Sequence, residues 1–157
     1  MQFKNWYLTI RLLTTLLVLS SSAFSASLEP FRLTIAKSFD APVQFHVAAD
    51  KNQPQLVITY WSGIRQIQSG KVERTDVRDL SKEQLAEIKK LFNGIDMSAL
   101  ASDDTQGLDG STWVLSTGGA SYRIWSPEVD YTYRGIGALV DLGGYLWWLG
   151  GVPGEYW

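Results

Sequence analysis

An export signal in a chain without cysteine is the feature that most constrains how this protein can fold. The first 25 residues carry only positive charges; an apolar stretch lies at 12–19 and small residues follow at 20–26. This order is typical of a cleavable secretory signal peptide, with cleavage expected between Ser25 and Ala26 or, alternatively, after Ala23. Small exported domains often rely on disulfides, so this one must be stabilised by packing alone.

The expected signal peptide indicates where the protein works and how much of the chain folds. Its apolar run is shorter than the ~20 residues that a membrane-spanning helix needs, which favours cleavage over an uncut membrane anchor. Without cysteine there is no site for a lipid anchor, and the absence of twin arginines favours the general secretory route. We therefore expect a signal peptide over 1–25 and a single α+β domain over 26–157, periplasmic or secreted.

Charge and aromatic content narrow the partners of the mature domain. It keeps 12 of the 14 basic residues and all 16 acidic ones, a formal charge of −4. Because the sequence has no evident basic patch, nucleic acid and anionic lipid are poor candidate partners. Six tryptophans remain in the mature chain, and these large side chains add buried area to a domain that lacks disulfides.

Alternating apolar and polar residues predict a sheet in the first half of the mature domain. Strands are expected at 31–37, 43–47 and 56–61. Ser-Gly pairs on both sides of 64–68 indicate two tight turns, and hence a three-strand meander that ends near 76–77. In that register Ile58 and Val72 both lie opposite Ile67, and the three would share one buried face.

Residues 81–94 carry the clearest helix signal. Ser81 is a good N-cap with Gln84 as its capping-box partner. The apolar stripe is formed by Leu85, Ile88, Leu91 and Phe92. Asn93-Gly94 is expected to end the helix.

A hairpin is expected after a polar loop at 102–112. Gly118-Gly119 separates two alternating segments at 113–117 and 120–125. A two-residue turn would place Trp113 opposite Ile124 on the core side and keep both strands in register. Ser-Pro then stops the second strand.

The apolar C-terminus predicts a second helix at 136–149. Its inner face is expected to contain Ile136, Leu139, Val140, Leu146 and Trp147. Tyr145, Trp148 and Leu149 would point outwards and leave an exposed apolar patch, which makes this helix the one mature segment expected to allow membrane contact. Five glycines, one aspartate and its short length argue against a membrane span. Together the elements predict an α+β fold in which an antiparallel sheet of about five to seven strands carries two main helices on one face.

Side chains suited to catalysis or metal binding are scarce. His46 is the only histidine, lies inside an expected strand and is interpreted as an ordinary strand residue. One histidine and no cysteine make zinc, iron and copper sites improbable. Asp103, Asp104 and Asp109 do not match the EF-hand spacing and are interpreted as a solvated turn. We therefore expect no metal site and no cofactor.

Two groups of residues remain as weak site candidates. Asp109 with Glu128 or Asp130 would be the acid and base of a glycoside hydrolase, although nothing in their spacing requires it. The aromatic candidates for a binding surface are Trp125, on the hairpin face opposite the core, together with Trp148 and Trp157.

A short pattern resembles a group of small exported bacterial proteins of unknown function. It reads DGxxW…Y…WSP, here Asp109-Gly110, Trp113, Tyr122 and Trp125-Ser126-Pro127, and it precedes an apolar C-terminal helix. The resemblance covers about residues 70–150 and implies an α+β envelope or secreted protein, but it supplies no activity. This chain differs in its short, glycine-rich hairpin and its Trp-rich tail.

The leading expectation is an exported, non-enzymatic binding module of the bacterial envelope. Its partner would be an envelope protein or polysaccharide. The alternatives are a carboxylate-based hydrolase of envelope polysaccharide and a periplasmic inhibitor or immunity-type protein that neutralises an exported toxin.

Overall fold

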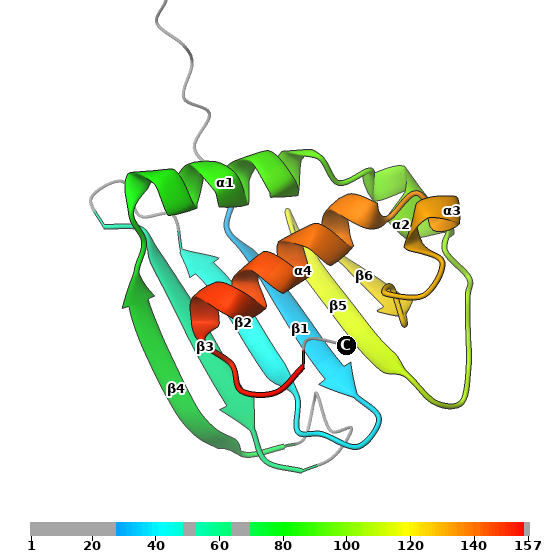
Figure 1. Ribbon diagram of the computed structural model, residues 1–157, viewed down its shortest axis with the longest axis horizontal. Helices are drawn as coiled ribbons and strands as arrows, with labels where there is room; N and C mark the ends of the chain where they lie inside the picture. The colour runs from blue at the N-terminus through cyan, green and yellow to red at the C-terminus, as the bar shows by residue number, and fades with distance from the viewer. Residues whose placement is uncertain (1–27, 49–52, 64–69, 156–157) are drawn as a thin grey trace, which may run out of the picture.

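The computed structural model describes residues 28–48, 53–63 and 70–155, so the expected signal peptide and Trp157 lie outside the described part of the chain. The expected α+β class is confirmed. A six-stranded antiparallel sheet carries two long helices on one face, and two short helices lie at one end of the molecule (Figure 1).

The chain builds the sheet from two sides. The strands are β1 (Phe31–Lys37), β2 (Val43–Ala48), β3 (Gln55–Trp61), β4 (Val72–Asp79), β5 (Ser111–Thr117) and β6 (Ala120–Trp125). The helices are α1 (Lys82–Asn93), α2 (Met97–Ser102), α3 (Tyr131–Arg134) and α4 (Gly137–Gly150). The strand order is β4-β3-β2-β1-β5-β6. The first four strands thus form a meander, and the β5–β6 hairpin pairs with the other side of β1 after the chain has passed through α1 and α2.

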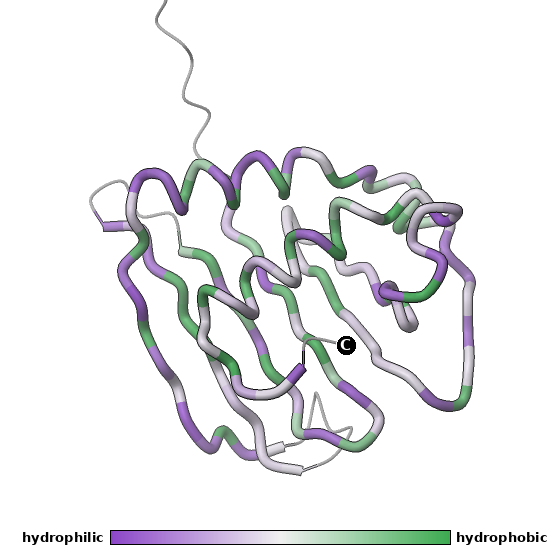
Figure 2. Tube along the Cα trace, viewed as in Figure 1, coloured by the Kyte–Doolittle hydropathy of each residue, from purple (hydrophilic) through white to green (hydrophobic). Residues whose placement is uncertain are grey.

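The face of the sheet that meets the helices is apolar. Leu33 of β1 lies opposite Phe45 of β2 and Leu115 of β5, and all three are fully buried. Helix α1 contributes Phe92, whose ring stacks on Phe31 with centroids 4.6 Å apart. The central strands carry hydrophobic residues, whereas β4 at the edge is largely hydrophilic (Figure 2).

Elements with strong local signals are confirmed. The hydroxyl of Ser81 accepts from the Gln84 N–H at 3.2 Å, and the Gln84 side chain accepts from the Ser81 N–H at 2.8 Å, which completes the capping box of α1. The helix ends at Asn93. The β5–β6 hairpin has the expected register, with Trp113 opposite Ile124.

The expected pairing of β3 with a strand at 64–68 is wrong. Strand β3 pairs with β4 instead, so Ile58 lies opposite Asp76 and Trp61 opposite Val72. Residues 64–68 lie outside the described part of the chain. Val72 is exposed and does not share a buried face with Ile58. Because β4 is an edge strand with solvent on one side, it has little need of apolar residues.

Two short helices and one buried leucine also differ from expectation. Helices α2 and α3 contain only six and four residues, too few for a helical period to be recognised. Ser102 ends α2 and Ser111 begins β5, so the polar loop spans only 103–110. In α4 the five expected inner residues are buried, but so is Leu149, which was expected to point outwards. The reason is that the buried face of α4 includes eight of its fourteen residues and is wider than a single stripe.

The edge strand β4 carries charges on the side that faces the helices. Arg74, Asp76 and Arg78 lie opposite the inward-facing residues of β3. Arg74 forms an ion pair with Asp76 at 3.1 Å, and its guanidinium lies 4.1 Å from the centroid of the Tyr60 ring. Charged groups at these positions discourage a further strand from adding to the sheet.

Among the described residues, no helix lies over the opposite face of the sheet (Figure 1). We call it the open face. Its central positions include Arg32 of β1, His46 of β2, Ser116 of β5 and Arg123 of β6, because these residues alternate with the buried ones.

Candidate functional site

Three loops meet at the end of the sheet where β1 ends and β5 begins. They span 38–42, 103–110 and 126–130, and we call this region the loop end. The Ser38 N–H and hydroxyl donate to the Gly110 carbonyl at 2.9 and 2.6 Å, and the Ser38 hydroxyl accepts from the Gly110 N–H at 3.0 Å. The third loop is joined to the start of β5, where the Ser126 N–H donates to the Ser111 carbonyl at 2.7 Å.

Trp125 lies directly beneath the second loop. A Cβ atom on Gly107 would lie 2.1 Å from the Trp125 ring, so only glycine allows the loop to pass this close. A Cβ atom on Gly110 would lie 2.0 Å from the Ser126 hydroxyl, and its φ of +148° also favours glycine. Trp125 is therefore half-buried, whereas Trp113 on the core side of the hairpin is fully buried. With Leu108 and other residues it lines a hollow of about 210 Å³.

A chain of hydrogen bonds fixes the corner after β6. The Ser126 hydroxyl accepts from the Ser111 N–H at 3.0 Å. The Ser111 hydroxyl accepts from Trp113 Nε1 at 2.9 Å and lies 2.9 Å from both carboxylate oxygens of Glu128, to which it donates. Glu128 thus already serves as the acceptor that orients Ser111. Residues of the DGxxW…WSP pattern therefore pack against one another and are linked by hydrogen bonds at this corner.

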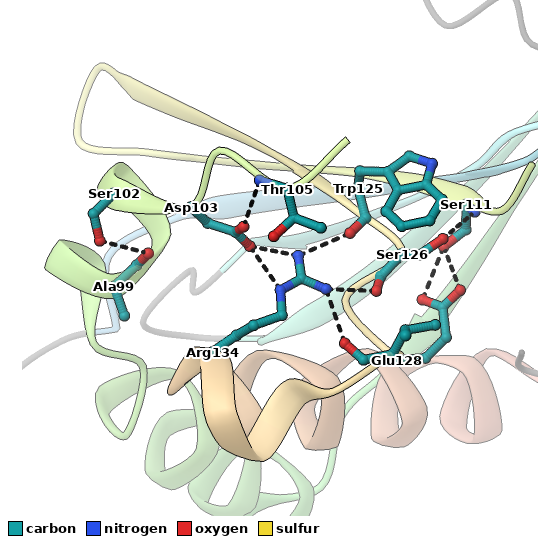
Figure 3. A network of polar contacts seen from close by, with 10 residues as sticks. Ala99, Ser102, Asp103, Thr105, Ser111, Trp125, Ser126, Glu128 and Arg134 are labelled. Carbon is teal, nitrogen blue, oxygen red and sulfur yellow. Dashed lines mark hydrogen bonds and ion pairs between the residues drawn. The ribbon is translucent and has the colours of Figure 1, made fainter. Parts of the chain in front are cut away.

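The side chain of Arg134, the last residue of α3, connects the second and third loops of the loop end (Figure 3). Its Nε and Nη2 atoms donate to Asp103 Oδ2 at 3.1 and 2.5 Å. The same guanidinium donates to the carbonyls of Trp125, Ser126 and Val129 at 2.8, 2.7 and 3.0 Å. The two charged side chains are only 11% (Arg134) and 4% (Asp103) exposed. One buried cation therefore joins the second loop to the third.

The electrostatics of this pair favour its charged form. Burial acts to raise the pKa of Asp103, but it is outweighed by hydrogen bonds from Arg134 and Thr105 and by the Arg134 charge. The pKa of Asp103 consequently lies below its ordinary value. Asp103 is therefore ionised at neutral pH, so its ion pair with Arg134 can hold the two loops together.

The loops display apolar side chains to solvent. Phe39 is 75% exposed on the first loop, Leu108 is 93% exposed on the second, and Val129 is 48% exposed on the third. Exposed carboxylates, Asp40 and Asp109, accompany them. Apolar groups held out on braced loops and edged by charges are typical of a contact surface.

The carboxylate candidates from the sequence fall in this region in different settings. Asp109 is exposed on the second loop. Glu128 is half-buried on Ser111, as described above. Asp130 begins α3 in a left-handed conformation, with φ of 54°, and makes no side-chain hydrogen bond to the helix end.

The remaining aromatic candidates lie elsewhere. Trp148 is 71% exposed on α4 and stacks on Tyr145 at a centroid distance of 5.8 Å. Trp157 is outside the described residues. Trp113 is buried as expected.

Sequence reasoning missed the residues that make the loop end. Phe39, Leu108 and Val129 are isolated apolar residues in polar segments, and only the meeting of three loops makes them a group. Arg134 is separated from Asp103 by 31 residues, so no local pattern could pair them.

No protein-family model matches the chain, and no curated protein matches it. Among the described residues there is no group of three or more His, Asp or Glu side chains that could hold a metal ion. In the same part of the chain, no helix combines the length and hydrophobicity that crossing a membrane requires.

Proposed function

We propose that the protein is an exported, non-enzymatic binding module of the bacterial envelope, and that its loop end holds another envelope protein. The observation that carries this proposal is the display of Phe39, Leu108 and Val129 on three braced loops. The first two are hydrogen-bonded to each other, and Arg134 connects the second to the third. In protein contacts a few well-placed side chains carry most of the binding free energy. Anchors that are already held in place lose little conformational entropy on binding, which increases affinity.

The hydrolase alternative has less support from the contacts. A glycosidase needs one carboxyl group to act on the substrate as an acid and a second as base or nucleophile. Both carboxylate oxygens of Glu128 are engaged with Ser111, which itself binds Trp113. These contacts suit a structural role for Glu128.

An inhibitor or immunity-type protein would use the loop end in the same way, with an exported toxin as the partner. The neighbouring genes distinguish the two kinds of partner, because a toxin-like neighbour would favour a toxin over another envelope protein.

Site-specific photocrosslinking in intact cells tests the proposal. A photoreactive amino acid at Leu108 or Phe39 should yield the same discrete adduct, whereas one at Val77, 55% exposed on β4, should not. The purified partner should then bind the wild-type protein and lose affinity for Leu108→Asp, which changes only a side chain that is 93% exposed. The absence of adducts from both loops, or the same adduct from Val77, would refute a loop-end contact.

A further inference from the structure

The open face brings together cationic and titratable side chains that are far apart in the sequence. Arg32 of β1 lies directly opposite His46 of β2. On its other side Arg32 lies opposite Ser116 of β5, which in turn lies opposite Ser121 of β6. Arg123 is two residues along β6 from Ser121, which places its Cα on the order of 12 Å from that of Arg32.

Arg32 and Arg123 carry the positive charge of this arrangement, and His46 adds to it only when it is protonated. Like charges directly opposite each other on a sheet repel, so Arg32 disfavours the protonated form of His46. Within residues 28–48, 53–63 and 70–155, no carboxylate forms an ion pair with Arg32, His46 or Arg123. The two arginines of this face are therefore free to pair with an anionic ligand.

The same face is hollowed where these side chains lie. One hollow, of about 410 Å³, is lined by Arg32, His46 and the serines at 116 and 121. The loop-end hollow of about 210 Å³ also reaches this face, where Arg123, Trp125 and Thr112 line it. The two hollows share no lining residue, and together they offer cations, hydroxyl groups and an indole.

We propose that the open face binds an acidic polysaccharide, whose carboxylates pair with Arg32 and Arg123 and whose sugar rings lie on the hydroxyls and the indole between and beside them. Arginine matches a carboxylate with two parallel hydrogen bonds. An extended peptide is the weaker candidate, because the backbone groups of inner strands β1, β2 and β5 are already used within the sheet and cannot pair with it. Recognition must therefore come from side chains alone.

His46 makes this site sensitive to pH. Partial burial and, secondarily, the Arg32 charge hold the pKa of His46 below its ordinary value of 6.5. The charged and titratable groups that face it across the open face are Arg32 on β1 and, farther away, Arg123 on β6 and Asp79 on β4; on β3 it faces the uncharged Val57. Acidification protonates His46 and adds a third cation, so binding of an anion strengthens as the pH falls through that lowered pKa.

Calorimetry with an oligogalacturonate of defined length tests the site. Arg32→Gln and Arg123→Gln should each weaken binding about tenfold, which corresponds to about 1.4 kcal/mol. The matched control is Arg78→Gln, an exposed strand arginine on the helix side of β4, which should bind as the wild type does. His46→Gln should remove the strengthening at low pH. Unchanged melting temperatures establish that the variants fold.

Three results would overturn the proposal. The first is equal binding of the methyl-esterified oligomer, in which the carboxylates are blocked. The second is an equal loss of affinity in Arg78→Gln. The third is equal or tighter binding of poly-L-glutamate, which would reassign the face to acidic peptides. The loop-end variant Phe39→Ser changes a residue that lines neither hollow. It should keep full saccharide affinity and lose affinity for the protein partner, so failure here is distinguishable from failure of the protein contact.

Discussion

Replacing Arg134 by methionine tests whether the loop end depends on its buried cation. Methionine keeps much of the length of the side chain but removes five hydrogen bonds. The substitution leaves the Asp103 carboxylate, only 4% exposed, without its charged partner. It also removes a donor from three carbonyl groups, of which that of Ser126 still accepts from the Val129 N–H. Breaking a buried ion pair by removing one member typically costs about 3–5 kcal/mol. Such a loss is a large part of the 5–15 kcal/mol that typically stabilises a domain.

Urea unfolding of Arg134→Met at neutral pH measures this loss. The double variant Arg134→Met/Asp103→Leu should recover part of the stability, because it no longer buries an unpaired carboxylate. The control is Arg74→Met, which breaks an exposed ion pair with Asp76 and should change the unfolding midpoint little. The reasoning is refuted if Arg134→Met costs no more than Arg74→Met.

The same pair predicts how stability responds to acid. The folded-state pKa of Asp103 is depressed below the ordinary value of 3.8. Its contribution is therefore fully present above the unfolded pKa and is lost as the pH falls through the folded one. In Arg134→Met the same carboxylate is buried without its cation, so burial raises its pKa above the ordinary value and it takes up a proton earlier on acidification. The stability difference between the wild type and Arg134→Met should therefore be largest near neutrality and should shrink as the pH falls. A difference that persists unchanged in strong acid would contradict the assignment.

Three further predictions concern other parts of the chain. Gly107→Ala places a methyl group 2.1 Å from the Trp125 ring and should cost about 1–3 kcal/mol in thermal unfolding, as overpacking does; a neutral result would mean that the loop is not seated on the indole. Ser81→Ala removes the hydroxyl that caps α1 and should cost about 1 kcal/mol in urea unfolding, with the helix content otherwise retained. The exported protein should have an intact mass that begins at Ala26, and recovery of the whole 157-residue chain from the periplasm or medium would contradict cleavage.

Local signals predicted the elements whose geometry is set by neighbouring residues. The register of the β5–β6 hairpin follows from one two-residue turn and the alternation on each side, so Trp113 falls opposite Ile124. The start of α1 follows from a capping box that spans only four residues. Neither depends on the rest of the fold, which is why both could be inferred from the sequence.

Pairings and sites that depend on tertiary placement could not be predicted in this way. The partner of β3 was misassigned because the Ser-Gly pair after Trp61 looks like a tight turn, whereas the Ser62 N–H donates to the carbonyl of Lys71 at 2.7 Å and β4 begins at Val72. The open-face cations come from three strands and show no clustering in the sequence, which therefore suggested no basic patch. The meeting of Arg134 with Asp103 likewise depends on the whole fold.

The charged inner side of β4 also bears on how the protein behaves when crowded. A strand that added beside β4 from another molecule would have to bury Arg74, Asp76 and Arg78 next to its own side chains, and the desolvation of these ions opposes that step. At the other margin, the Trp125 carbonyl at the end of β6 is already taken by Arg134. Edge-to-edge growth of the sheet is therefore penalised along β4 and loses one acceptor at the end of β6, which favours a discrete molecule when the protein is crowded.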